Sequence, residues 1–437
     1  MILARRLLIL SIAVLPGVVT AQTVTGRFSS SAYTWQKYDT LSSSQTIVRG
    51  FQTLLLDASQ GDLSFHTSLY GAADFSQSVG NDGVVRASNL FLRWKNIGGA
   101  ADINIGRIPI FAGVGNGAVD GALVKARGWD DRVWFTAYGG ENVMPDLRAE
   151  SFGNLDKKFL VGSQIITTFI PQARIGVSYV NRHILRDSYT AVRPDTAFNA
   201  VSVLVTPDSR AEQILGLDAR FDHEDGHSAY CRFDYDLNSD HTLREQLGAR
   251  YKASDCVAFT GDFIYRQPNV PYNSFFSVFP VSSISEYEGG VEYTFSRSYY
   301  MFARYAYVGY VDAVSRRISV GVNGSYGSIS YSGSNGYAGI LNSFYAQGMY
   351  PLLNRRVVPM IGLSYATYRI SEDNLTNEKT FAGSFGAVVR PDPLISADAQ
   401  LQWLHNKIAS NDVRLLVKLN YWFAHNFNMV QRKETGE

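Results

Sequence analysis

The sequence lacks any apolar run long enough to form a membrane-spanning helix. Such a helix needs roughly 20 apolar residues, and charges interrupt every apolar stretch except the one from Leu7 to Val19, which is shorter than that. A surplus of one sign of charge is missing too, because the formal net charge is only +1. This near balance gives no reason to expect nucleic acid as a partner.

Cysteine is scarce, and the two thiols are placed where they cannot meet. Cys231 shares its strand parity with Phe233, which we expect on the outer face of a sheet, whereas Cys256 shares the parity of Asp262, which we expect on the inner face. A further strand near residues 243–253 should separate them. Since cysteines on opposite faces of non-adjacent strands cannot reach the spacing that a disulfide requires, the sequence predicts two free thiols.

Enzyme motifs are equally sparse. There is no Gly-x-Ser-x-Gly elbow, and the seven histidines are scattered. The run from His223 to His227 has the letters of a zinc-protease signature, but its Asp-Gly pair favours a turn and the motif needs a helix. The glycine run Gly113–Gly117 is not followed by Lys-Ser/Thr, so we interpret it as a mobile loop rather than a phosphate site. We predict no enzyme, no metal and no cofactor.

The sequence does contain an export signal, over residues 1–21. Arg5 and Arg6 supply the positive start, the apolar stretch follows, and Ala21 is the small residue that signal peptidase prefers. No cysteine follows that point, so a lipid anchor there is not expected. The mature chain is predicted to leave the cytoplasm without a stop in the inner membrane.

Apolar and polar residues alternate from Val24 to Phe423, in segments separated by turn residues. In the closing segment, residues 413–423, the apolar residues share one parity, and Arg414, Lys418 and Asn420 lie on the other. A strand sends successive side chains to opposite faces, so each segment has one apolar and one polar face. The chain also has 26 tyrosines, which suits an aromatic belt at a membrane surface. The pattern predicts an all-β protein, a transmembrane antiparallel up-and-down β-barrel with lipid outside and water within.

Loop lengths predict the orientation and the number of strands. Short turns are expected near residues 59–62, 95–100, 128–131, 171, 254, 296–298 and 391–393, and long connections near residues 36–46, 111–116, 139–156, 185–210, 267–285 and 371–377. Barrels of this kind have short periplasmic turns, long outer loops and an even number of strands. A simple count gives 23 strands. Moving residues 200–206 into the long loop 185–210, which we expect to fold over or into the pore, leaves about 22, within a range of 18–24.

The expected domain boundaries follow from the first and last strands. The barrel should occupy residues 22–423, because the alternation starts too early to leave room for an N-terminal plug domain. Residues 424–437 are mostly polar and follow the last aromatic of the closing strand. We expect them to form a periplasmic C-terminal tail.

The amphipathic strands, the alternating loop lengths and the aromatic ending Tyr421-Trp422-Phe423 together resemble Gram-negative outer-membrane porins. The segment Ile105-Gly106-Arg107, followed by Val119-Asp120-Gly121, is also similar to a strand-end pattern of porin-like barrels. The resemblance is one of architecture and indicates no substrate-specific family. It implies an outer-membrane location, with outer-membrane lipids and small hydrophilic solutes as partners. Homo-oligomers are common among porins, although no interface pattern is visible in this chain.

Charges of both signs occupy the inner parity, where they would set a transverse field that selects solutes. The alternative is a salt-bridged interior with no particular solute, and for the acids around Asp218–Asp236 we predict such a lattice rather than a divalent-cation site. The pore-lining candidates are Asp218, Arg220, Asp222, Arg232, Asp234, Asp236, Arg250, Lys252, Asp262, Arg266, Glu286, Glu288, Glu292, Arg304, Asp398, Arg414 and Lys418.

Three functions stay open on the sequence alone. The leading hypothesis is a channel for passive diffusion of small hydrophilic solutes or ions. The second is a structural sleeve that holds an exported polymer or an electron-carrying protein. The third is a lipid hydrolase, since a Ser–His pair across neighbouring strands of the wall would leave no sequence motif.

Overall fold

The computed structural model describes residues 22–38, 44–76, 83, 85–148, 155–185, 188–194, 196, 199–206, 211–268, 283–337, 339–369, 376–409 and 411–426. Over these residues the chain is all-β and contains no helix. None of the described segments is therefore a helix that is long and apolar enough to cross a membrane. The expected export signal, residues 1–21, lies outside the described residues.

The described chain forms 24 strands, and consecutive strands pair antiparallel except at β10 and β11, which pair only with each other while β9 pairs with β12. They are β1 (Thr23–Tyr38), β2 (Ser44–Gln60), β3 (Leu63–Asp74), β4 (Val85–Ile97), β5 (Ala101–Ala112), β6 (Gly115–Gly128), β7 (Val133–Asn142), β8 (Lys158–Thr167), β9 (Ala173–Ile184), β10 (Tyr189–Pro194), β11 (Ala200–Val205), β12 (Glu212–Asp222), β13 (Ser228–Asp236), β14 (His241–Lys252), β15 (Val257–Arg266), β16 (Ile284–Ser296), β17 (Tyr299–Gly309), β18 (Val314–Gly324), β19 (Gly327–Gly336), β20 (Ile340–Met349), β21 (Val357–Arg369), β22 (Glu378–Asp392), β23 (Ile395–His405) and β24 (Asp412–Asn426).

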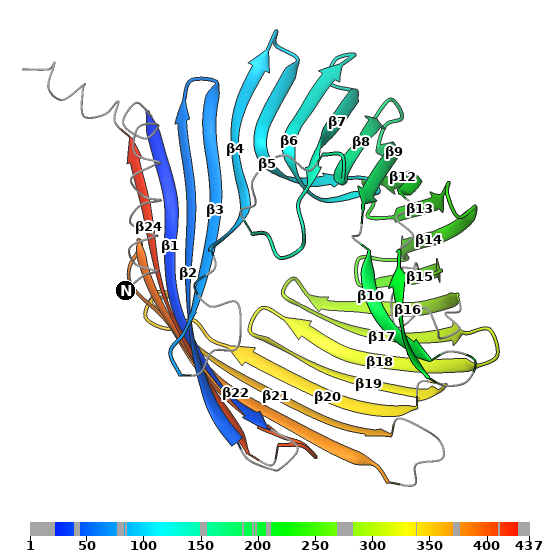
Figure 1. Cartoon of the computed structure of the whole chain (residues 1–437). Coiled ribbons are helices and arrows are strands. Elements are labelled where there is room, and N and C mark those ends of the chain that lie inside the picture. Colours follow the sequence, from blue (N-terminus) through cyan, green and yellow to red (C-terminus); the bar gives the residue numbers. More distant parts are fainter. Residues whose placement is uncertain are drawn as a thin grey trace, which may run out of the picture.

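Twenty-two of these strands close into one barrel (Figure 1). Closure is made by β1, which pairs with β2 on one side and with β24 on the other. Buried polar side chains reinforce it, because Asn420 accepts a hydrogen bond from Ser29 at 2.8 Å and donates one to Ser396 at 3.0 Å. The predicted count of 22 strands is confirmed.

Side-chain alternation explains why the sheet closes with its apolar face outward. In β24 the side chain of Leu419 is 55% exposed, whereas that of its neighbour Asn420 is 5% exposed. The same contrast of exposed apolar and shielded polar side chains recurs in β23 and β16. An open sheet with this pattern would present long unpaired edges, and closure removes them.

The two ends of the barrel differ as the loop lengths predict. Thr23 pairs with Asn426, so the described chain ends lie together at one end, which we call the terminal end. All the turns expected to be short lie at that end, for example Gly61-Asp62 between β2 and β3. The expected long connections lie at the opposite end, which we call the loop end, but the one expected at residues 111–116 is wrong, because β5 and β6 are joined there by a tight turn.

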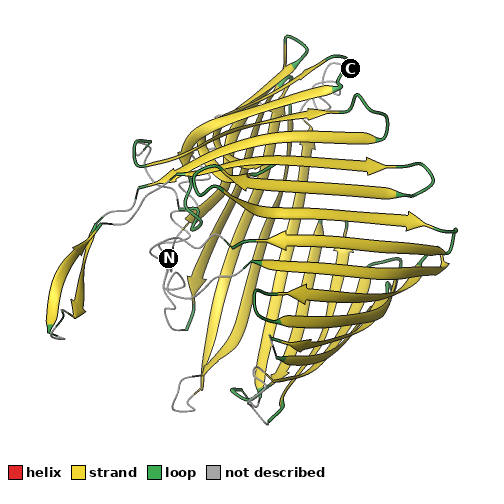
Figure 2. Ribbon diagram, turned by 90° about the vertical axis from the view of Figure 1, so that its right-hand side faces the viewer, coloured by secondary structure: helices red, strands yellow, loops and turns green. Residues whose placement is uncertain are grey.

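The connection between β9 and β12 contains a separate hairpin. Residues 200–206 were expected in a loop, and β11 indeed pairs only with β10 and not with the wall. Figure 2 shows this hairpin standing beyond the loop end, away from the barrel. The expectation that this loop folds over or into the pore is therefore wrong for the hairpin.

Two further expectations need correction at the terminal end. Cys256 was assigned to an inward position of a strand, but it lies in the turn between β14 and β15. It is exposed, and both it and Cys231 are free thiols, as predicted. The closing strand also continues past Phe423 to Asn426, because the pairing with β1 extends that far.

Candidate functional site

The β5–β6 hairpin leaves the wall and folds into the lumen. β4 pairs with β5 only as far as Arg107, and β7 pairs with β6 only from Val119 onward, yet β5 and β6 stay paired with each other to Ala112. In Figure 1 these strand ends lie across the inside of the barrel. The expected mobile loop at residues 113–117 is therefore wrong, because this run forms the tip of a packed hairpin.

Glycines allow the hairpin to bend. Gly106 has a φ of +130° and Gly117 one of +140°, a region that residues with a Cβ rarely adopt. A Cβ on Gly106 would also lie 2.3 Å from the carbonyl oxygen of Leu90 on β4. The bend starts at Gly106, one residue before the pairing with β4 ends.

The tip of the hairpin is tied to the inner face of β9, three strands further along the same side of the wall. The backbone N–H of Val114 donates a 3.0 Å hydrogen bond to Ser178 on β9, and the Arg182 guanidinium donates to the carbonyl of Asn116. Apolar packing adds to these bonds, because Ile110 and Leu160 are both 0% exposed. The cluster that they share draws residues from β4 to β9.

A buried ion pair, which we call the hairpin latch, holds the base of the hairpin. The Arg107 guanidinium donates two parallel hydrogen bonds to Asp120, at 2.7 and 2.6 Å, and the side chains are only 7% and 12% exposed. The Nη1 group of Arg107 donates to the carbonyls of Leu147 and Arg148, both at 3.0 Å. Bidentate geometry with further hydrogen bonds from the guanidinium is the arrangement that stabilises a buried pair.

The segment around Leu147 and Arg148, which receives these bonds, also pairs with the edge of β4 that β5 leaves open. Where β5 has left, the exposed edge of β4 is taken up by the connection after β7, through a bridge of Arg86 with Arg148 and a 3.1 Å bond from the Ala87 N–H to the Leu147 carbonyl. Unpaired edge groups facing lipid would be costly. Arg107 on β5 therefore connects β6, through Asp120, with the segment after β7 that pairs with β4.

A neutral ion network lines the lumen on β14 and β16–β18. Its members are Arg250, Arg304, Arg317, Glu286, Glu288 and Glu292. The Arg304 guanidinium lies 3.4 Å from Glu292 and 3.9 Å from Glu288. Arg317 lies 2.9 Å from Glu288 and also contacts Glu286. Three arginines and three glutamates balance one another on this wall.

The acids of β12 and β13 pair within their strands rather than in a lattice across them. Arg220 binds Asp222 at 2.6 Å, and Arg232 binds Asp234 at 3.0 Å, each two residues along the same strand. Asp236 is 2% exposed and accepts hydrogen bonds from the backbone of Asn238 and the hydroxyl of Ser239, so it shapes the β13–β14 turn. The predicted neutralisation by neighbouring arginines is confirmed for Asp222 and Asp234, as separate pairs along each strand rather than a connected lattice.

The other candidates are scattered over the inner face. Asp398 accepts a hydrogen bond from Asn420, and Lys252 reaches Asp255 in the β14–β15 turn at 2.8 Å. That bond lowers the pKa of the Asp255 carboxyl. Lys418 lies opposite Asp398 in the register, and Arg266 ends β15 at the loop end.

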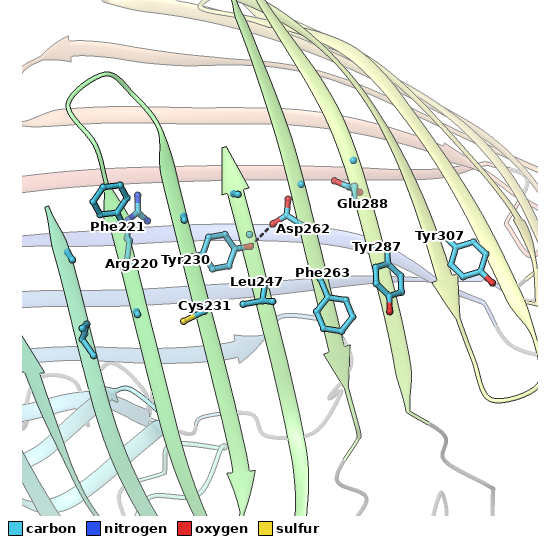
Figure 3. Close-up of a pocket in the computed structure, with 18 of the residues that line it drawn as sticks. Arg220, Phe221, Tyr230, Cys231, Leu247, Asp262, Phe263, Tyr287, Glu288 and Tyr307 are labelled. Atoms are coloured by element: carbon cyan, nitrogen blue, oxygen red, sulfur yellow. Dashed lines mark hydrogen bonds between the residues drawn. The ribbon is translucent and has the colours of Figure 1, made fainter. Parts of the chain in front are cut away.

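Tyr230 and Asp262 form a hydrogen bond across β14 on the inner face, and Gly248 makes room for it. The Tyr230 hydroxyl donates a 2.7 Å hydrogen bond to Asp262 two strands away (Figure 3). Between them lies Gly248 on β14, where a Cβ would come within 2.2 Å of the tyrosine ring. The missing side chain lets the ring lie flat over the strand.

The recess shown in Figure 3 opens on the outer face of the same strands. Its floor is made of small residues in cross-strand register, with Ala249 opposite Gly261 and Gly261 opposite Gly289. Phe263 and Tyr287, exposed on the outer parity, border it. It faces the outside of the barrel rather than the lumen.

Sequence reasoning missed several inner residues. Arg317 completes the neutral network, yet its neighbour Arg316 blurs the alternation. The latch residues Arg107 and Asp120 were noticed only as a strand-end pattern, with no role. Asp74, 1% exposed at its side chain, pairs with Arg49 across β2 and β3, in a region where neither parity is purely apolar.

Comparisons with known proteins support the fold. No protein-family model matches the chain, and no curated protein matches it either. Among solved structures, it is similar to the P pilus usher (PapC) translocation pore, with a TM-score of 0.50 and 9% identity over 92% of this chain and 99% of that chain. PapC in the E. coli P pilus tip assembly intermediate gives a TM-score of 0.51 at 9% identity, over 90% of this chain and 60% of that chain. The porin OccK5 (OpdH) of Pseudomonas aeruginosa gives 0.43 at 8% identity, over 92% and 98%.

The closed antiparallel wall, its even strand number and its apolar outer face define the class of protein. The chain is a transmembrane β-barrel of the kind found in the outer membrane of Gram-negative bacteria. The location expected from the sequence is supported by this architecture.

Proposed function

We propose that the protein is an outer-membrane channel for the passive diffusion of small hydrophilic solutes or ions. The observation that carries the proposal is the polar inner face, where arginine and carboxylate side chains line a 22-stranded wall. Barrels of 16 or more strands are wide enough to leave an aqueous path unless something fills them. We assign the lining to the candidate charges named above, together with Arg317.

The inward hairpin would set the width of this path. It occupies part of the lumen near the loop end and is tied to Ser178 and Arg182 on the inner face of β9. Its position narrows the passage. The described residues contain no folded plug domain that would close it. Such a constriction would favour small solutes over polymers.

Planar bilayers test the proposal directly. The full chain, purified and refolded in detergent, should give discrete steps of ion conductance when it inserts. A membrane that stays sealed despite inserted, folded protein would contradict the channel and support a filled sleeve. Sustained hydrolysis of lipid by the same preparation, abolished by replacing one serine or histidine, would support the hydrolase instead.

A further inference from the structure

Ser64, His66 and Asp57 form a hydrogen-bonded chain on the lumen side of β2 and β3, which we call the lumen triad. Ser64 and His66 are two residues apart on β3 and therefore share a face. Asp57 lies directly opposite His66 in the register of β2 with β3, which are neighbours in the wall (Figure 1). Leu63, of the opposite parity, is 55% exposed on the outer surface. The three polar side chains thus face inward, near the terminal end.

The order of the atoms is that of a serine nucleophile and its base. The Ser64 hydroxyl lies 2.9 Å from Nε2 of His66, and the Asp57 carboxylate contacts Nδ1 of the same ring. A carboxylate at Nδ1 favours the tautomer that carries its proton there, so Nε2 is left to accept the serine proton. The same chain of contacts activates the serine of acyl-transfer enzymes on unrelated folds. No sequence motif marks it here, because Asp57 meets His66 only through the pairing of β2 with β3.

Packing holds the imidazole between its two partners. The Phe91 ring on β4 stacks on His66, with centroids 4.9 Å apart and an interplanar angle of 25°. Phe91 is itself buried and belongs to the apolar cluster shared with the inward hairpin. A base that is held by a buried ring on one face and by a carboxylate at Nδ1 is already oriented before it takes a proton.

Arg93 places a positive charge beside the serine. It lies opposite Ser64 in the register of β3 with β4. Its Nε–H donates a 3.0 Å hydrogen bond to Asn104, and within the described chain its terminal amino groups make no other hydrogen bond or ion pair. Acyl transfer develops a negative oxygen next to the nucleophile, and a guanidinium with unused donors can stabilise that charge.

The serine is more shielded than its partners, and this limits the substrate. Ser64 is 7% exposed, whereas the side chains of His66 and Asp57 are 23% and 57% exposed. A hydroxyl so shielded can be reached by a small acyl group and not by a long chain. Because the triad faces the lumen, its substrates would be dissolved in water rather than in the membrane.

We propose that Ser64 is a nucleophile that cleaves small water-soluble esters in the lumen, with His66 as its general base and Asp57 as the residue that positions His66. His66 takes the Ser64 proton while the serine oxygen bonds to the ester carbonyl carbon. The proton then passes to the leaving alcohol as the C–O bond breaks, which leaves acyl-Ser64. Water releases the acid by the same proton transfers, so ester and water give acid and alcohol. This activity goes beyond the proposed channel and does not depend on conductance.

Acetylation of the full chain in detergent tests the nucleophile. With p-nitrophenyl acetate, the protein should release nitrophenolate, and acid quenching during the reaction should trap an acetyl group on Ser64 that peptide mass spectrometry locates. p-Nitrophenyl palmitate and phospholipid vesicles should not react. Ser64→Ala should lose both the release and the acetyl group. Ser59→Ala is the matched control and should react as the parent does, because Ser59 lies opposite Ser64 on β2 but its hydroxyl contacts Thr23 rather than a histidine.

Variants of the other two members assign their roles. His66→Asn should slow acetylation about a hundredfold, and Asp57→Asn should slow it about tenfold or more. Asp57→Glu keeps the carboxylate and should recover part of the loss, whereas a merely structural contribution would be met better by the isosteric asparagine. Retained heat-modifiable migration in gels shows that each variant is folded, and His66→Gln serves if His66→Asn is not.

Three results would overturn the proposal. The first is a folded parent that does not react with the acetate ester, including one that cleaves phospholipid instead. The second is a Ser64→Ala variant that is acetylated as the parent is, and the third is unchanged acetylation in folded His66 variants. A conducting barrel that does not react would refute the inference and leave the channel intact, whereas reaction without conductance would refute the channel alone.

Discussion

Arg107 shows how one side chain can decide the shape of a barrel. Its guanidinium binds Asp120 on the hairpin and two carbonyls on the segment that repairs the wall. A buried pair is a weak source of stability compared with apolar packing, but losing one partner leaves the other charged and unsolvated. The latch is therefore best understood as a device that specifies the inward position.

We expect Arg107→Leu to lower the free energy of unfolding by about 3–5 kcal/mol, because it strands the Asp120 carboxylate in the wall. Urea unfolding from lipid vesicles, followed by tryptophan fluorescence, measures the change. The double variant Arg107→Leu/Asp120→Leu should recover part of the loss. Arg220→Leu removes an exposed pair of similar length and should unfold as the parent does. Equal stability of the parent and Arg107→Leu would mean that the latch contributes nothing.

Charge reversal at Arg304 probes the pore lining. Arg304→Glu would place a third carboxylate beside Glu288 and Glu292 and make this wall negative. We expect the reversal potential in a potassium chloride gradient to shift toward greater cation preference. Arg297→Glu makes the same charge change in a turn and should have a much smaller effect. An unchanged cation/anion ratio would mean that Arg304 does not line the pore.

At the scale of elements, the β5–β6 hairpin separates what a sequence pattern can and cannot predict. Alternation fixes which side chains share a face, and it located the first residues of β23 and β24 closely. It could not reveal that Ile108 and Ile110 pack inside the lumen, because apolar residues near a strand end look the same whether they face lipid or the hairpin cluster. The glycines at 106 and 117 were the available signal.

The off-barrel hairpin illustrates a second limit. Removing residues 200–206 from the wall relied on the requirement for an even strand number, and the structure confirms it. The partner strand β10 was not anticipated, because it is short and ends in Pro194. Among the site residues, ion partners depend on rotamers and register, which is why the sequence predicted salt bridges on β12 and β13 but not that each pair lies within one strand.

The bend at Gly106 should tolerate no side chain. Gly106→Ala would need a positive φ and would press its Cβ against the Leu90 carbonyl. We expect a clear loss of folded, heat-modifiable protein after refolding. Gly289→Ala is the control, because a Cβ there meets nothing within 4 Å. Equal yields for the two variants would argue against the bend being sterically determined.

Shortening the inward hairpin should widen the path. Replacing residues 109–118 by a tight turn removes the constriction, so single-channel conductance should rise about twofold or more. Deleting residues 190–204 shortens the hairpin that stands off the barrel, and conductance should then stay as in the parent. Equal conductance of the parent and both shortened variants would mean that the narrowest point lies elsewhere.

For the whole molecule, the native thiols report the orientation in the membrane. Cys256 lies exposed at the terminal end, which we expect to face the periplasm, and Cys231 lies within a strand. In intact cells a membrane-impermeant maleimide should leave Cys256 unmodified and should label it once the outer membrane is permeabilised. Asp312→Cys, at the loop end, should react in intact cells. The reverse labelling pattern would mean that the terminal end faces the outside of the cell.

The pairing of the first wall strand with the last has a consequence for how the gene could be arranged. Because Thr23 already neighbours Asn426, a short linker could join the two ends, and new ends could be opened at the tight turn Trp129–Arg132. Such a circular permutant would keep every strand neighbour of the parent. The folded barrel would then be the same whichever strand is synthesised first.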